Sequence, residues 1–382
     1  MNLKLIALNF LLLSNIIVSQ ILAFEVENIP VQSEGRIKPF DSFARNQLLR
    51  FYGKREVKEH QLKATDWLLD LILDPQGGRD LKIFNIRNPE VVSSLFLDWT
   101  NEHKYSYNEI ISGLKNQIDL ITAIDEKDDS DKSPFEKQLI ELSHNAIVFE
   151  ELSYMKNIKL IPPALLDENA VWQSPFDFII SGITPAYHQE EILNSLQKYL
   201  AARFQKNNSE MNNALARYET ITADLPISSL DVKKLKSETW MNEVDLFVKS
   251  LAFYILSFLL IGVSWMVKPT LFRNISYLSL IVGFLIHGYG ILLRMQIMGR
   301  PPVSTLYESV IFVSFIILLL AVTLEYFRAD GIGIFIGSVG GSILHFVGFS
   351  YAADGDTLGM LVAVLDSNFW LATHVTTITI CL

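Results

Sequence analysis

The chain has 382 residues, half of them hydrophobic, with 42 acidic against 32 basic residues. From Phe247 onward six acidic and six basic residues balance, so the whole acidic excess lies before that position. An acidic front portion joined to a nearly charge-free second portion excludes a basic nucleic-acid-binding surface and indicates a membrane protein with a large water-exposed part.

Within residues 1–23, an apolar stretch follows Lys4 and ends near Ala23. This pattern predicts a secretory signal peptide or an uncleaved anchor, and either would carry the next part of the chain out of the cytoplasm. Residues 24–246 show helical amphipathic periodicity, for example over 67–73, broken by polar and proline-containing loops. The sequence therefore predicts a mostly α fold whose first large unit is a helical extracytoplasmic domain.

Residues 247–382 predict a polytopic bundle of transmembrane helices. Four runs are long and apolar enough to cross a bilayer, at 250–267, 275–293, 303–324 and 331–351. A fifth run covers the thirteen residues 370–382, roughly 20 Å of helix against a hydrocarbon core of roughly 30 Å. We therefore expect an incomplete fifth span, and, with the front domain outside, a His374 that enters its helix from the outer face.

Three histidines fall within the expected spans: His287, His345 and His374. Ionisable side chains in a membrane are costly and are functional candidates by default, and neutral imidazole is a common metal or haem ligand. His374 lies four residues after Trp370, so both share one helix face, and Trp370 suits the interfacial aromatic belt. His374 is thus either an axial haem ligand at the outer surface or a histidine that reaches the headgroup region.

His287 shares a helix face with Gly283, Gly290 and Arg294. The glycines allow close approach by another helix or by a flat ring. Arg294 would lie at the outer end, where its guanidinium could pair with a carboxylate such as a haem propionate. The alternative, which the residues favour, is a packed histidine bonded to a neighbouring helix.

A second small-residue face runs through the fourth expected span, with Gly337, Gly341 and His345 at four-residue spacing. This face predicts close helix packing, with His345 buried between helices in a structural role.

Glu308 lies near the outer end of the third expected span and needs a cationic partner if it is buried. Arg294 and Arg300 are the nearest ones, across a short Pro301-Pro302 loop, and the pairing predicts a loop-shaping role. No phosphate loop, nucleophile elbow or zinc signature is present. The single cysteine, Cys381, excludes both a disulfide framework and a Cys-x-x-Cys-His motif.

Two stretches, HGYGILLR from His287 and GRPPVSTLYES from Gly299, resemble the CcsA (ResC) family of System II cytochrome c biogenesis. Residues 365–375 are similar to that family's first external histidine region. Residues 29–45, together with 159–163 and Trp172, are similar to the extracytoplasmic region before CcsA in fused CcsB–CcsA proteins. The resemblance implies a multi-pass protein of the bacterial inner membrane with its large N-terminal domain on the periplasmic side.

The same resemblance implies a component of a cytochrome c haem lyase. It would bind haem b transiently at the outer face, through His374 as an axial ligand of the iron, and help deliver it to apocytochrome c. The implied partners are a CcsB (ResB)-like membrane protein, apocytochrome c and thiol-reducing proteins, and no nucleic acid. The family's tryptophan-rich segment and second external histidine would lie beyond Leu382, so we expect this portion to be inactive alone.

Two other classes of protein stay open on the sequence. One is a transporter or channel subunit, although transporters usually show matched halves with broken spans. The other is a membrane scaffold whose outer domain binds a partner.

Overall fold

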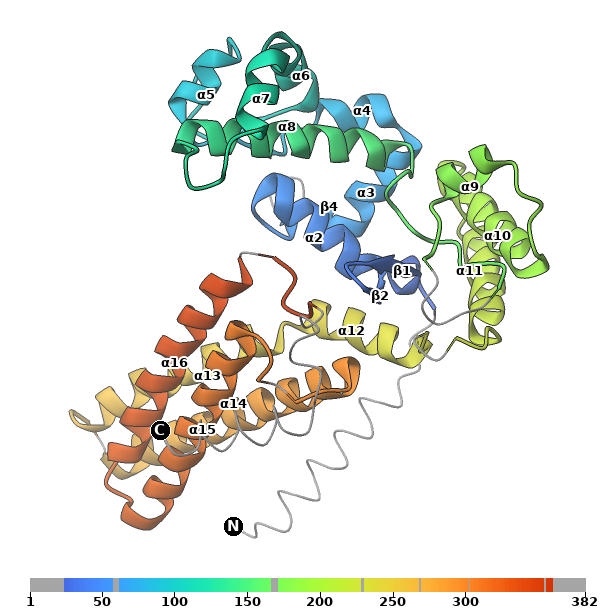
Figure 1. Cartoon of the computed structure of the whole chain (residues 1–382). Coiled ribbons are helices and arrows are strands. Elements are labelled where there is room, and N and C mark those ends of the chain that lie inside the picture. Colours follow the sequence, from blue (N-terminus) through green and yellow to red (C-terminus); the bar gives the residue numbers. More distant parts are fainter. Residues whose placement is uncertain are drawn as a thin grey trace.

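The computed structural model describes residues 24–57, 62–165, 171–227, 230–267, 269–301, 303–353 and 355–359. The described residues are mostly helical, which confirms the predicted fold class at that level (Figure 1). The expected signal segment 1–23 and the expected fifth span, with Trp370 and His374, lie outside the described residues.

The N-terminal region, residues 24–244, adds three antiparallel pairs of short strands that the sequence does not predict. They are β1 (Pro30–Ser33) with β2 (Arg36–Pro39), β3 (Glu56–Val57) with β4 (Leu62–Lys63), and β5 (Phe84–Asn85) with β6 (Lys104–Tyr105). The β1–β2 hairpin turns at Glu34 and Gly35, whose φ angles of 52° and 81° match the two left-handed positions of a type I′ turn. This turn fixes the register of the strand that carries Arg36 and Lys38.

Helices make up most of this region. They are η1 (Val26–Asn28), α2 (Phe40–Tyr52), α3 (Ala64–Leu73), α4 (Pro75–Asp80), α5 (Pro89–Ser94), α6 (Tyr107–Asn116), α7 (Ile118–Asp125), α8 (Pro134–Ser153), α9 (Pro175–Ser181), α10 (Tyr187–Phe204), α11 (Asn208–Ala223) and α12 (Val232–Val244).

Local signals explain where several of these helices begin. The longest, α8, starts with Pro134 at its first position and a capping box in which Ser133 and Glu136 bond each other's backbone. The core of the region contains aromatic rings, with Phe51 packed on Trp67, Phe84 and Phe149 at centroid distances of 5.9, 5.6 and 5.9 Å. All four side chains are almost fully buried, so this cluster fastens α2, α3 and α8 together.

Within the described part of the chain, four helices are long and apolar enough to cross a membrane, as the sequence predicts. They are α13 (Leu246–Ser264), α14 (Pro269–Met298), α15 (Leu306–Arg328) and α16 (Ile332–Ala352). We call them the membrane bundle. The structure extends the expected second span at both ends, because α14 continues beyond the apolar run 275–293.

The small-residue face of α16 packs directly against α15. A Cβ on Gly333 would lie 2.6 Å from the carbonyl oxygen of Ala321, and one on Gly337 would lie 2.7 Å from the Ala321 Cβ. Gly341 lies against Leu318 of α15 and Tyr254 of α13. The glycines therefore let α16 approach two helices closely, and this packing brings His345 to the bundle interior.

Helix α12, the last helix of the N-terminal region, lies next to the bundle (Figure 1). It packs on α2 and β2 on one side and on α14 on the other. Asp245, with a left-handed φ of 50°, is the single residue between α12 and α13. A single residue thus separates α12, in the N-terminal region, from α13, the first membrane helix.

Candidate functional site

The membrane bundle contains a pair of buried histidines. His287 of α14 and His345 of α16 are both fully buried, and their ring centroids lie 4.7 Å apart with the planes nearly perpendicular. The sequence identifies each histidine as a candidate but does not predict that they meet. Their contact joins the second and fourth membrane helices at the bundle interior.

Hydroxyl groups surround this pair. The Tyr254 hydroxyl lies 3.2 Å from Nδ1 of His287, and the Ser250 hydroxyl lies 3.1 Å from Nε2 of His345. Nδ1 of His345 lies 2.8 Å from the carbonyl oxygen of Gly341. A further polar neighbour of His287 is the Ile311 backbone. The pair is therefore a buried polar cluster in which hydroxyl and backbone groups contact the two imidazole rings.

This arrangement does not fit a haem iron held between the two histidines. A metal–imidazole bond is about 2 Å long, so two such bonds in line span about 4 Å before the rings are counted. The centroids are only 4.7 Å apart. The glycine face beside His287 is also filled, because Gly283 lies against Tyr254 and Gly290 against Phe247, both from α13.

At the end of the bundle next to the N-terminal region, Glu308 lies between two arginines. Its Oε1 is 3.3 Å from Arg294 and 3.8 Å from Arg300, and all three side chains are less than a tenth exposed. Oε2 of Glu308 also accepts a hydrogen bond from the backbone N–H of Ser304, and the backbone N–H of Glu308 donates to the Thr305 hydroxyl at the start of α15. The carboxylate thus shapes the loop between α14 and α15.

Ion pairs continue from this end of the bundle into the N-terminal region. Arg36 of β2 forms two hydrogen bonds with Glu238 of α12, at 2.8 and 2.9 Å. Asp356, in the segment 355–359 that follows α16, accepts from Lys38 at 2.8 Å and from Arg36 at 3.2 Å. We call residues 355–359 the post-α16 segment.

Electrostatics stabilise the ionised forms of this network. Burial acts to raise the pKa of Asp356, but the positive charges of Lys38 and Arg36 outweigh it and hold that pKa well below its usual range. Burial likewise acts to lower the pKa of Arg36, and the carboxylate of Glu238 more than offsets it, so that pKa is raised. The ionised form of each side chain is thus stabilised by the opposite charge of its partner.

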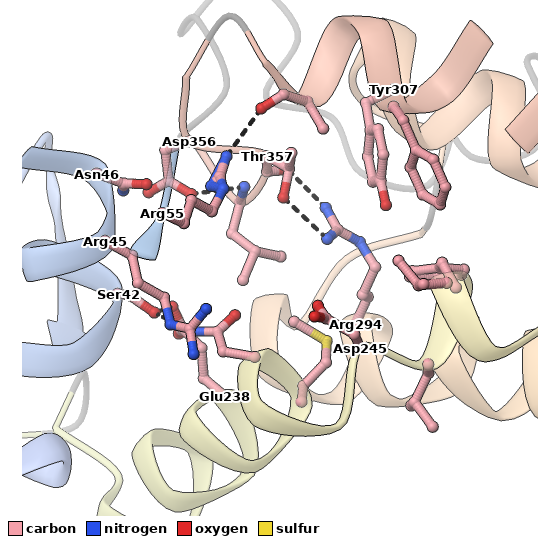
Figure 2. Close-up of a pocket in the computed structure, with 18 residues that line it drawn as sticks. Ser42, Arg45, Asn46, Arg55, Glu238, Asp245, Arg294, Tyr307, Asp356 and Thr357 are labelled. Carbon is pink, nitrogen blue, oxygen red and sulfur yellow. Dashed lines mark hydrogen bonds between the residues drawn. The ribbon is translucent and has the colours of Figure 1, made fainter. Parts of the chain in front are cut away.

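A cavity of about 180 Å³ lies where α2, α12 and the bundle meet (Figure 2). Its wall is both charged and aromatic, with side chains that include Arg45, Arg55, Glu238, Arg294, Asp356, Phe247, Tyr307 and Phe349. The volume is below the roughly 300–1,000 Å³ of ordinary ligand pockets. The cavity can hold a carboxylate arm beside these arginines, but it does not enclose a haem.

Among the described residues, Phe247 connects this cavity with the histidines. Its ring lies 5.7 Å from that of His287 and 6.4 Å from that of His345, and it also lines the cavity. Phe349 does the same from α16, at 6.0 Å from His345. These two aromatic rings thus lie between the cavity and the buried histidine pair.

The sequence does not predict several residues around the buried histidine pair or in the ion-pair network. Tyr254 and Ser250 are ordinary residues of an apolar run, and only the packing of α13 on α14 and α16 brings them to the histidines. Lys38 and Asp356 are separated by 318 residues, and no local pattern links them. No signal in the sequence distinguishes Asp356 either, because Asp354 follows the same span two residues earlier.

The chain is thus a helical membrane protein with a large N-terminal region fastened to one end of its bundle. No protein-family model matches it, and no curated protein matches it in sequence.

Proposed function

We propose that this protein handles haem in cytochrome c assembly, as a CcsA-like component of the bacterial inner membrane. In this proposal the N-terminal region lies on the periplasmic side. The protein binds haem b at the outer membrane face and helps deliver it to the Cys-x-x-Cys-His motif of apocytochrome c. A CcsB-like membrane protein and thiol-reducing proteins complete the machinery.

One observation carries this proposal: the residues that bear the resemblance converge at one end of the bundle. Arg294 and Arg300 meet at Glu308, and the same two arginines hold the post-α16 segment through Thr357 and Gly359. In the sequence that segment leads on to Trp370 and His374. A cationic site on the segment that leads in sequence to the expected external ligand suits a cofactor that carries carboxylates.

The roles proposed for the residues follow from their chemistry. In this proposal His374 is the group that would bind iron through a neutral imidazole nitrogen, and Trp370 precedes it by four residues in the sequence. Arg294 offers a guanidinium next to the cavity, with its Nε free of any described partner. His287 is kept as a buried polar residue of the bundle, because its contact with His345 leaves no room for iron between them. When bound, haem supplies the vinyl groups that form thioether bonds with cysteine thiols.

The visible spectrum of the purified protein tests this function. We expect a Soret band that survives purification and is lost or shifted in His374→Ala. His144→Ala is the matched control, since His144 is a half-exposed histidine of α8 far from the membrane helices in the chain. A protein without haem, or a spectrum that does not change in His374→Ala, would reject the proposal.

A second candidate, a scaffold that binds a partner, is favoured by one feature of the N-terminal region. A groove of about 720 Å³ between α9 and α10 is lined mainly by apolar side chains such as Ile179, Leu193 and Phe204. Ile179 is 70% exposed and Phe204 76% exposed. Contiguous apolar surface of this kind often marks a site that binds another protein. Phe204→Asp should release a bound partner in co-purification while the Soret band is unchanged; loss of the band without release would argue against a scaffold.

A further inference from the structure

The cavity where α2, α12 and the membrane bundle meet has two unlike sides. Polar side chains of the N-terminal region line one side, namely Arg45 and Asn46 of α2 and Arg55 just after it (Figure 2). Phe247 and Phe349 of the bundle line the other side. The volume of about 180 Å³ is well above the roughly 30 Å³ that one water molecule occupies in the liquid. A group of several heavy atoms therefore fits between a polar and an apolar wall.

Two buried hydrogen-bond donors of this wall have no hydrogen-bond partner among the described residues. They are Nδ2 of Asn46, in α2, and Nε of Arg294, in α14. Both residues line the cavity, and the Arg294 side chain is 4% exposed. A buried donor without an acceptor costs free energy. An acceptor-rich group in the cavity would remove this cost for donors from both parts of the molecule.

The arginine charge around the cavity exceeds that of the carboxylates bonded to it. In the described part of the chain, Arg294 and Arg300 share the single carboxylate of Glu308. Arg55 donates instead to two backbone carbonyl oxygens at and just after the end of α16. Burial lowers the pKa of Arg55, and the negative charge of Asp356 offsets this only in part. A negatively charged group in the cavity would therefore be stabilised more than a neutral one.

One carboxylate of the wall opposes an anion. Asp245, the residue between α12 and α13, also lines the cavity, and its charge would repel a bound anion. Its φ of 50° is a left-handed conformation that asparagine also adopts. Asp245→Asn can therefore remove this charge without a change of backbone, and it should strengthen the binding of an anion.

The cavity lies at the level of the bilayer surface. Its wall includes Leu246, Phe247 and Val248, the first three residues of α13. Helix α13 has 19 residues, about 28 Å of helix against a hydrocarbon core of roughly 30 Å. Its first turn therefore lies where the lipid headgroups begin. Val248 is 52% exposed, so this edge of the cavity adjoins the lipid-facing surface of the bundle.

We propose that this cavity binds the phosphate group of an anionic phospholipid, with Arg55, Arg294 and Asn46 as donors. The acyl chains would then follow the exposed side of α13 from Val248. Phosphate oxygens accept several hydrogen bonds at once, and guanidinium groups bind them in pairs. Inorganic phosphate shares this chemistry but has no apolar part for the bundle side of the cavity. The lipid is a ligand separate from haem, which the cavity does not enclose.

The test titrates the full chain, in an uncharged detergent, and follows its unfolding temperature. The probes are dioctanoyl phosphatidylglycerol, dioctanoyl phosphatidylcholine and inorganic phosphate. Arg55→Gln and Asn46→Ala each remove a donor, and Asp245→Asn removes the opposing charge. Arg328→Gln is the matched control, because it removes the same charge from a 58% exposed side chain at the opposite end of α15.

We expect phosphatidylglycerol to raise the unfolding temperature more than either other probe at the same concentration. Its dissociation constant should become roughly tenfold larger in Arg55→Gln, since a hydrogen bond between charged groups is lost. It should become roughly threefold larger in Asn46→Ala, roughly threefold smaller in Asp245→Asn and stay unchanged in Arg328→Gln. Asn46→Ala keeps the test decisive if Arg55→Gln does not fold, because Nδ2 of Asn46 has no described partner to lose.

Each contrary result overturns a stated part of the proposal. Equal shifts with phosphatidylglycerol and phosphatidylcholine would show that charge does not select the lipid. An equal shift with inorganic phosphate would reject a lipid as the source of the phosphate group. Binding that is unchanged in Asn46→Ala, or weaker in Asp245→Asn, would reject the cavity as the site. These results leave the haem proposal untouched, since the Soret band reports on haem separately.

Discussion

Arg36 and Glu238 form a bidentate ion pair between a hairpin strand near the start of the chain and the helix that leads into the membrane. The two bonds are 2.8 and 2.9 Å long, the residues are 202 positions apart, and the side chains are 10% and 2% exposed. The Ser42 hydroxyl donates to the same carboxylate at 2.6 Å. Because α12 adjoins α13 through one residue, this pair fastens the N-terminal region to the first membrane helix.

Removal of the carboxylate in Glu238→Ala should lower the free energy of unfolding by about 3 kcal/mol. This is the lower end of the range for breaking a buried pair, since Arg36 keeps Asp356 as a partner. Denaturant unfolding in detergent measures it. Glu243→Ala is the control, because Glu243 and its partner Lys63 are 65% and 62% exposed and such pairs contribute less than about 1 kcal/mol. Equal effects of the two variants would show that the Arg36 pair is not structural.

Gly333→Ala should destabilise the bundle by roughly 1–3 kcal/mol. Its new Cβ would lie 2.6 Å from the Ala321 oxygen and 2.7 Å from the Glu325 nitrogen, both backbone atoms that cannot move aside easily. In Gly262→Ala the new Cβ meets nothing within 4 Å, so the higher helix propensity of alanine should leave stability equal or raise it by up to about 1 kcal/mol. Thermal unfolding of both variants checks the difference, and a harmless Gly333→Ala would contradict the close packing of α15 and α16.

Tyr254→Phe removes the hydroxyl that lies 3.2 Å from Nδ1 of His287. Hydrogen bonds between membrane helices contribute about 0.6 kcal/mol on average, so we expect a loss of that order. The control is Tyr351→Phe, a side chain that is 41% exposed. A stability change in the control as large as in Tyr254→Phe would remove the assigned role of this hydroxyl.

The pH dependence of stability should carry a contribution from Asp356. Its pKa is lower in the folded protein than in the unfolded chain, where it is about 3.9, so its contribution is complete above that value. The contribution falls as the pH drops from about 4 through the lower folded pKa. Unfolding measured against pH should therefore show a smaller acid-induced loss in Asp356→Asn than in the wild type. Parallel curves would contradict the ion pairs of Asp356.

The membrane helices could be predicted because hydrophobicity is a local property of the chain. An apolar run such as 331–351 predicts a membrane helix by itself, and α16 differs from that run by one residue at each end. The extension of α14 past its apolar run could not be predicted, since its ends depend on contacts made outside the bilayer-length segment. The two-residue strands β3 and β4 are too short to show a period of two.

The same distinction between local and long-range contacts applies to the candidate site. The sequence places Glu308 beside Arg294 and Arg300 because only a short loop separates them, and the ion pairs in the structure follow that geometry. The meeting of His287 with His345 depends on how α14 and α16 are placed around α13, which no residue spacing encodes.

The long separation between Lys38 and Asp356 has a consequence for the order of biosynthesis. Lys38 is synthesised 318 residues before its partner, so the pair cannot form until all four membrane helices have left the ribosome. Until then the N-terminal region has Glu34 as the ionic partner for Lys38 and lacks the contact that ties it to the end of α16. This ion pair therefore closes only after α13, α14, α15 and α16 have all been synthesised.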